Sequence, residues 1–90
     1  MPRYLVERTF PDGLAVPANT EGAAALARVV AVNAEHGVTW LHSYVSPDRM
    51  RSYCIYDAPS SEAIREVARR NGLPVGCITE VSVLDPYFHH

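Results

Sequence analysis

"VTWLHSYVSPDRMRSYCIYDA", residues 38–58, carries the clearest strand pattern in the chain. The outer parts, residues 38–46 and 51–58, alternate along their length and are rich in β-branched and aromatic residues. Pro47 between them suits the second position of a turn. The stretch therefore predicts a β-hairpin.

The flanking segments repeat one arrangement on each side of this hairpin. Residues 2–10 predict a strand, and residues 21–36 predict a helix that Thr20 caps and Gly37 ends. After the hairpin, residues 61–71 predict a second helix, which Gly72 ends. Residues 77–85 then predict the last strand, before Pro86.

The order strand–helix–strand, twice over, predicts an α+β fold. We expect a ferredoxin-like βαββαβ sandwich, in which two helices cover one face of a four-stranded antiparallel sheet with strand order 4-1-3-2. At 90 residues the chain predicts a single domain over residues 1–90.

Charge and composition exclude several classes of partner. The formal net charge is −2, and all eight cationic residues are arginines without a basic stripe, so we expect no nucleic acid partner. No apolar run is long enough for a membrane span, and we expect no membrane partner. Cys54 and Cys77 lack metal or redox spacing and predict free thiols. Without a signal peptide pattern, we expect a cytoplasmic protein.

Alternation along the strands predicts two different faces of the sheet. The helix-covered face is expected to hold Val6, Tyr53, Ile55, Val81 and Val83, and the open face Leu5, Glu7, Cys54, Tyr56, Ile78, Glu80 and Ser82. A three-residue hairpin loop, residues 47–49, would pair His42 with Cys54 and place Trp40, His42 and Tyr44 on the open face. A loop of even length would place Leu41 there instead.

Helix 21–36 carries two apolar stripes, so it is apolar most of the way round. We expect the first of these to face the core, with the second facing a partner or simply tolerated at the surface. The first stripe is Leu26, Ala27, Val30 and Ala34, and the second is Ala25, Val29 and Val32.

The expected open face mixes aromatics with two carboxylates, an imidazole and a thiol. Such a face suits a pocket or a dimer interface, and we expect a homodimer of the dimeric α+β barrel type. Glu7, His42, Cys54 and Glu80 are the candidate site residues, because carboxylate, imidazole and thiolate suit a divalent transition metal such as nickel, zinc or copper.

Other interpretations of these residues stay open. Two close carboxylates would raise one pKa and give a general acid or base beside His42. In that case the protein is a small barrel enzyme of monooxygenase or isomerase type, whose apolar pocket of Trp40, Tyr44 and Tyr56 holds a small-molecule ligand. In a third interpretation the protein is a non-catalytic interaction module, in which the aromatics form the core of a dimer and the polar groups pair across its two-fold axis. Taken singly, His42 can be structural, the carboxylates can pair with arginines, and Cys54 can be a small hydrophobe. The terminal pair His89 and His90 is left out of the site, because it binds nickel weakly whatever the fold.

The chain resembles a family of small bacterial proteins of uncharacterised function that includes a nickel-binding member. The stretches that carry the resemblance are "YLVERTF", "GVTWLHSYVS", "CIYDAPSSEAI", "RNGLPV" and "ITEV" with "VLDP". The resemblance implies a ferredoxin-like homodimer that binds nickel for sequestration or sensing, with no established catalytic activity. It points to Glu7 in "LVE" and His42 in "LHS" as ligands, whereas Cys54 and Glu80 rest on the face pattern.

Overall fold

The computed structural model describes residues 1–14 and 19–87, which form one antiparallel sheet and two helices. His89 and His90 lie outside the described residues. The strands lie in the order β2-β3-β1-β4, which confirms the ferredoxin-like βαββαβ arrangement. The elements are β1 (Arg3–Thr9), α1 (Thr20–Glu35), β2 (Thr39–Val45), β3 (Arg51–Asp57), α2 (Ser61–Asn71) and β4 (Cys77–Val81).

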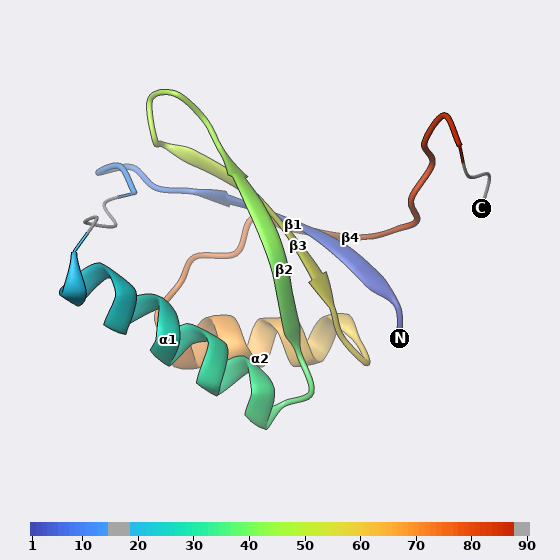
Figure 1. Ribbon diagram of the computed structural model, residues 1–90, viewed down its shortest axis with the longest axis horizontal. Helices are drawn as coiled ribbons and strands as arrows, with labels where there is room; N and C mark the ends of the chain where they lie inside the picture. The colour runs from blue at the N-terminus through green and yellow to red at the C-terminus, as the bar shows by residue number, and fades with distance from the viewer. Residues whose placement is uncertain (15–18, 88–90) are drawn as a thin grey trace.

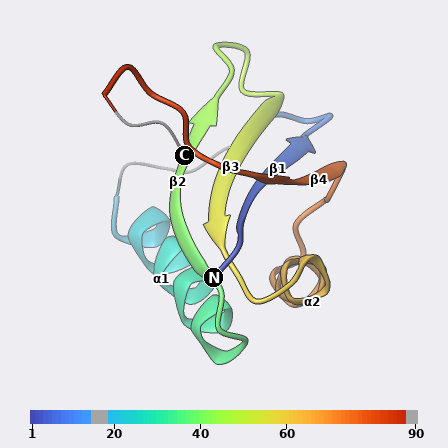
Figure 2. The ribbon, with the colours of Figure 1, turned by 90° about the vertical axis from the view of Figure 1, so that its right-hand side faces the viewer.

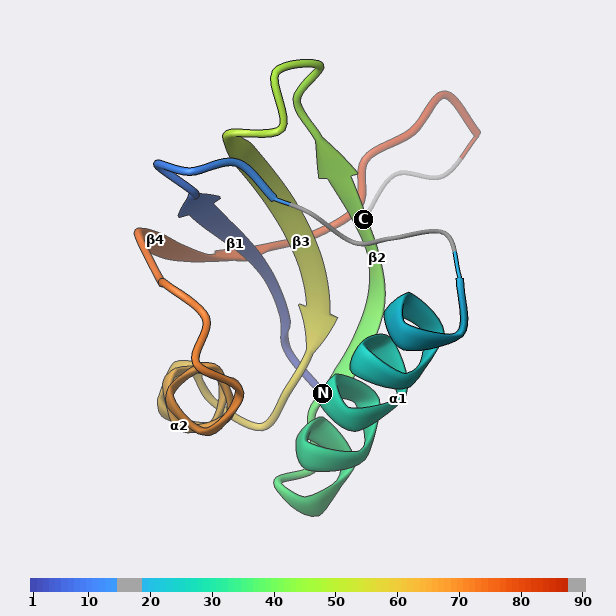
Figure 3. The same ribbon diagram turned by 90° about the vertical axis from the view of Figure 1, so that its left-hand side faces the viewer.

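Both helices cover the same face of the sheet and leave the other face bare (Figure 1). Helix α1 lies beside β2, and α2 lies below β1 and β4 (Figures 2 and 3). The buried core forms between the sheet and these helices. In the described residues, neither helix is long and apolar enough to cross a membrane.

Helix α2 follows its sequence pattern closely. Ser60 accepts a hydrogen bond from the Ala63 backbone N–H at 3.2 Å, and Gly72 ends the helix with φ of 67°. Ile64 and Val67, on its apolar side, are buried in the core. On the outer side Arg69 and Arg70 both donate hydrogen bonds to Glu66, lowering the pKa of its carboxyl to about 2.

Helix α1 differs from its prediction in its cap and in its buried side. The side chain of Asn19, not Thr20, accepts the capping hydrogen bond, from Gly22 N–H at 3.0 Å. The stripe expected to be buried, Leu26, Ala27, Val30 and Ala34, is exposed, and Ala25, Val29 and Val32 face the sheet.

Two residues that do not look apolar mark the buried side of α1. Gly22 and Asn33 are both buried, and they continue the line of Ala25 and Val29 at helical spacing. Asn33 accepts a hydrogen bond from the Asn71 side chain at 3.4 Å, which joins the two helices. Because one of the buried residues is an asparagine, the pattern of apolar residues did not identify the buried side of α1.

The hairpin loop has an even length, so the three-residue loop that would pair His42 with Cys54 is not formed. Residues 47–50 form the turn, because Ser46 N–H donates to the Arg51 carbonyl at 2.9 Å. Arg49 adopts a left-handed conformation with φ of 63°, and its Nε donates to the Leu14 carbonyl at 2.9 Å. This contact with the segment after β1 holds the turn. His42 consequently pairs with Ile55 instead of Cys54.

One extra residue in β2 changes which side chains face the helices. The pairing with β3 shifts between Trp40 and His42, which leaves Leu41 as a β-bulge. Trp40 therefore pairs with buried Tyr56 on the helix-covered face, whereas His42 lies on the open face. The three aromatic rings of β2 do not share one face as predicted.

A hydrogen bond spans this bulge. The Trp40 indole Nε1–H donates to Ser43 Oγ at 2.8 Å, and Ser43 is itself paired with Cys54 in β3. Both partners lie toward the helices, where Trp40 packs against the core. The bond gives the indole N–H an acceptor on the helix-covered face, where the bulge places Trp40.

The faces of β3 and β4 are also exchanged relative to the prediction. In β3, Cys54 and Tyr56 are buried toward the helices, and Tyr53 and Ile55 lie on the open face. In β4, Ile78 pairs with Val6 on the helix side and Val81 lies with Arg3 on the other. Each strand is apolar on both faces, so hydrophobicity alone could not choose.

We expect Ser43→Ala to lower the free energy of unfolding by about 1 kcal/mol, because the half-buried indole N–H loses its acceptor. Urea denaturation followed by tryptophan fluorescence measures it. Ser82→Ala, at an exposed position beyond β4, is the matched control and should change stability by less than about 0.5 kcal/mol. Equal stability of Ser43→Ala and wild type would show that the indole bond contributes nothing.

Candidate functional site

The open face of the sheet is organised in rows that cross all four strands. Direct partners in the strand pairing lie next to one another on the same face. One row is Tyr44, Tyr53, Glu7 and Cys77, and the next is His42, Ile55, Leu5 and Thr79. The first row therefore joins an acid, a thiol and two phenols on a surface that the helices do not cover.

Glu7 and Cys77 are cross-strand neighbours at one edge of this face. Gly76 sets their closeness, because its N–H donates to the Glu7 carbonyl at 2.9 Å and a Cβ there would lie 3.0 Å from that oxygen. The Cys77 thiol is free and exposed, and its Sγ lies 3.7 Å from Thr79 Oγ1. Sequence reasoning missed Cys77, since only the strand register places it beside Glu7.

His42 lies on the same open face but toward the opposite edge of the sheet. Its ring makes an edge-to-face contact with Tyr44, with centroids 5.2 Å apart. The pairing puts Glu7 two strands and one row away, roughly 12 Å between Cα atoms. Among residues 1–14 and 19–87, no three side chains of His, Cys, Asp or Glu come together as a metal site.

The other two predicted ligands point to the opposite face. Cys54 is only 6% exposed on the helix side, where its Sγ lies 3.7 Å from Ser52 Oγ. Glu80 pairs with Tyr4, which also faces the helices, and remains exposed at the edge of the sheet. Their predicted position beside Glu7 and His42 is wrong, because the face of each strand was assigned from apolar residues.

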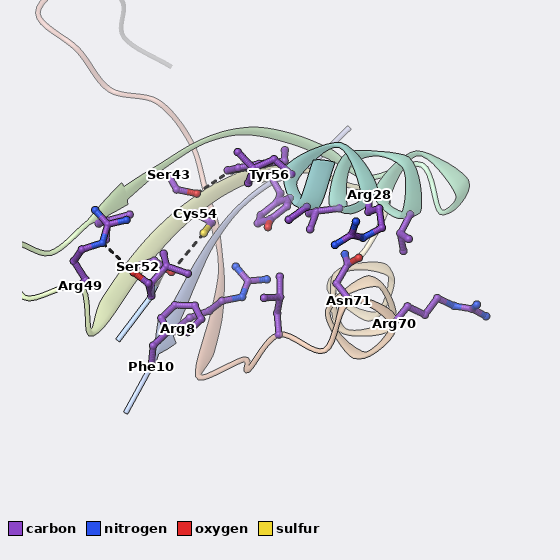
Figure 4. Close-up of a pocket in the computed structure, with 18 residues that line it drawn as sticks. Arg8, Phe10, Arg28, Ser43, Arg49, Ser52, Cys54, Tyr56, Arg70 and Asn71 are labelled. Carbon is purple, nitrogen blue, oxygen red and sulfur yellow. Dashed lines mark hydrogen bonds between the residues drawn. The ribbon is translucent and has the colours of Figure 1, made fainter. Parts of the chain in front are cut away.

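A hollow of about 640 Å³ lies between the sheet and the two helices, opposite the open face (Figure 4). Trp40, Cys54 and Tyr56 line it, while Tyr44 does not. The predicted pocket of Trp40, Tyr44 and Tyr56 is therefore divided between two faces. The residue that sequence reasoning missed here is Arg8, since an arginine inside a strand gives no signal of burial.

Arg8 is buried at the inner wall of this hollow, with 3% of its surface exposed. Its guanidinium carbon lies 5.7 Å from the centre of the Tyr56 ring, a cation–π arrangement. Burial raises the pKa of the Tyr56 phenol, and the positive charge of Arg8 opposes that rise. The hollow thus has a buried charge at its inner wall.

The sequence matches a family model described as "Nickel responsive protein SCO4226-like" over residues 4–81. This chain belongs to that family. The crystal structure of SCO4226 from Streptomyces coelicolor A3(2) matches with a TM-score of 0.73 and 21% identity, covering 92% of this chain and 99% of that one. At this identity the likeness shows the fold alone. No curated protein matches the sequence.

The metal-binding groups on the open face are of types that suit nickel, the metal in the description of the family. A carboxylate, a thiolate and an imidazole can each bind a first-row divalent cation. Glu7 and Cys77 are close enough to act together, but His42 of the same chain is too far away to join them. A site with all three donors needs a second copy of the chain.

A pH titration of Tyr56 tests whether its ring is buried on the helix-covered face. Because its pKa is raised above 10.0, the neutral phenol stabilises the fold below about pH 10, and this contribution is lost as the pH rises through the raised pKa. We expect the tyrosinate absorbance of the folded protein to show a step above pH 10 that is missing in Tyr56→Phe. The step should persist in Tyr44→Phe, which removes an exposed phenol. Its persistence in Tyr56→Phe would contradict the burial of this ring.

Proposed function

We propose that this protein is a nickel-binding homodimer, in which the bare faces of two sheets meet and form the metal sites between them. The observation that carries the proposal is the Glu7–Cys77 pair, which presents a carboxylate beside a free thiol on an uncovered face. The family's description as nickel responsive supports the choice of metal. The role in the cell would be sequestration or sensing.

Exposed apolar groups on and beside the open face support pairing with a second copy. Tyr44 is 63% exposed, and Leu5, Tyr53, Ile55 and Val81 of the same face are only partly covered. Residues 82–87 leave the sheet on the side away from the helices (Figure 1). This arm carries Leu84 and Tyr87, which are 75% and 86% exposed. A second copy would bury this area.

A two-fold axis between the sheets would bring together donors that one chain keeps apart. In an isologous dimer, each surface of one copy meets the equivalent surface of the other. His42 of one copy would then approach Glu7 and Cys77 of the second, and the symmetry would create two equal sites. A nitrogen, a sulfur and an oxygen donor suit nickel, with zinc and copper as competitors.

The enzyme interpretation has less support. It required His42 beside Tyr56 in one pocket, and these residues lie on opposite faces of the sheet. The described residues that line the hollow between the sheet and the helices include no histidine, aspartate or glutamate to act as general base. We therefore propose binding rather than catalysis.

A metal-bound Cys77 requires a thiolate, which favours a reducing compartment. Both cysteines are free, and Cys77 is exposed to solvent. A cytoplasmic location, where thiols stay reduced, is part of the proposal.

We expect isothermal titration to show nickel binding to a variant that ends at Phe88, which removes the terminal histidine pair. Cys77→Ser, Glu7→Gln and His42→Asn should each weaken the binding by at least about tenfold. Loss of a residue that only hydrogen-bonds to a metal ligand already lowers the affinity by about that factor. A thiolate-to-nickel absorption band should appear on binding and be absent in Cys77→Ser. Since proton release accompanies binding by Cys and His, the affinity should fall in acid.

Glu80→Gln is the matched control for Glu7→Gln, since both are exposed glutamates on neighbouring strands that face opposite sides. It should leave nickel binding unchanged. The proposal is wrong if Glu80→Gln weakens binding as much as Glu7→Gln, or if analytical ultracentrifugation finds only monomer with and without nickel.

A further inference from the structure

The strongest unexplained feature of the molecule is the buried guanidinium of Arg8. Only 3% of the Arg8 surface is exposed. The guanidinium forms no ion pair with a described residue, and its Nε–H has no hydrogen-bond acceptor among the described residues. A buried charge without a counter-ion is unfavourable unless something else compensates for it. The Tyr56 ring, 5.7 Å from the guanidinium carbon, compensates only in part, because the Nε–H stays without an acceptor.

The charges around the hollow all have the same sign. Four of the eight arginines line it, and no described lining residue is acidic. Two of the four are engaged elsewhere, since Arg49 Nε donates to the Leu14 carbonyl and Arg70 Nε donates to Glu66. Arg8 at the inner wall and Arg28, which is exposed at the rim of the hollow on α1, make no ion pair with a described residue. The hollow therefore favours an anion.

The remaining wall is largely apolar. Its apolar residues include Phe10, Leu14, Ala25, Val29, Val32 and Leu73, which come from the segment after β1, from α1 and from the chain after α2. Figure 4 shows Arg8 extending from β1 into the space between the sheet and both helices. The volume of about 640 Å³ is within the range of small-molecule sites.

We infer that this hollow binds a small molecule with an oxyanion head and an apolar body, such as a medium-chain carboxylate or phosphate. The head would pair with the Arg8 guanidinium, whose planar fork matches two oxygens of such a group. Ser52, the direct partner of Arg8 across the strands, adds a buried hydroxyl at the same wall. The apolar body would lie along α1 beneath Trp40.

This site is separate from the proposed metal site. It uses no residue of the open face, and its test needs no metal. A negative nickel titration would leave it standing, and a negative ligand titration would leave the nickel proposal standing.

The experiment compares four probes that share a twelve-carbon chain, on the full-length protein with a chelator present. Sodium dodecanoate, dodecyl phosphate, dodecan-1-ol and dodecyltrimethylammonium are titrated below their micelle concentrations. Fluorescence of Trp40, the one tryptophan of the chain, and calorimetry report binding. We expect dodecanoate or dodecyl phosphate to bind at least about tenfold more tightly than dodecanol. The order of these two identifies the preferred head.

Variants then assign the selectivity to Arg8. Arg8→Met keeps an unbranched side chain without the charge and should reduce the affinity for the oxyanion to that for dodecanol. Arg65→Met, on the outer side of α2 and away from the hollow, is the matched control and should bind as wild type does. Ala25→Phe, which fills the hollow from α1, should abolish the binding of every probe.

Equal binding of dodecanol and the two oxyanions by the wild type overturns the inference, and so does equal or tighter binding of the cationic probe. Undiminished oxyanion binding by folded Arg8→Met has the same consequence. If Arg8→Met does not fold, the selectivity of the wild type and the blocking by Ala25→Phe still decide the matter.

Discussion

The bulge at Leu41 is the constraint on which the rest of the structure depends. A strand whose side chains alternate strictly would place Trp40 and His42 on the same face. The extra residue lets Trp40 close the core against Tyr56 while His42 stays on the bare face. The indole bond to Ser43 Oγ lies across the bulge and stabilises this choice. A single additional residue therefore separates the one tryptophan from the histidine beside it.

This separation gives the two faces of the sheet different chemistry. The bare face carries exposed donors, with Glu7 beside Cys77 at one edge and His42 at the other, which suits a metal held between two copies of the chain. The helix-covered face borders a hollow with a buried arginine at its inner wall, which suits an anion with an apolar body. Soft donors and unpaired positive charge would interfere with each other in one cavity, because a cation site repels a guanidinium. The fold keeps them on opposite sides of one sheet.

The sequence was sufficient to predict the order of the elements, the strand order and the cap of α2, because glycines, prolines and alternation act locally. It did not predict the faces. Both sides of β3 carry aromatic or aliphatic groups, so Cys54 was placed with Glu7, although the register buries it. The pairing of β2 with β3 depends instead on the length of the hairpin loop, which hydrogen bonds of Ser46 and Asp48 hold locally and a contact between Arg49 and Leu14 holds from a distance. The place of Cys77 beside Glu7 follows from the pairing of β1 with β4, and Arg8 is buried on the same face of β1 as Val6. Neither position has a local signal in the sequence.

Nuclear Overhauser effects from two side chains of β2 test most directly whether Trp40 and His42 lie on opposite faces of the sheet. With the bulge at Leu41, protons of the Trp40 indole should show cross-peaks to Ser43 and Tyr56. The ring of His42 should instead show them to Tyr44 and Ile55. Cross-peaks from the His42 ring to the β-protons of Cys54 would contradict this arrangement of β2. That pairing belongs to a hairpin with a three-residue loop, in which the imidazole and the indole lie on the same face.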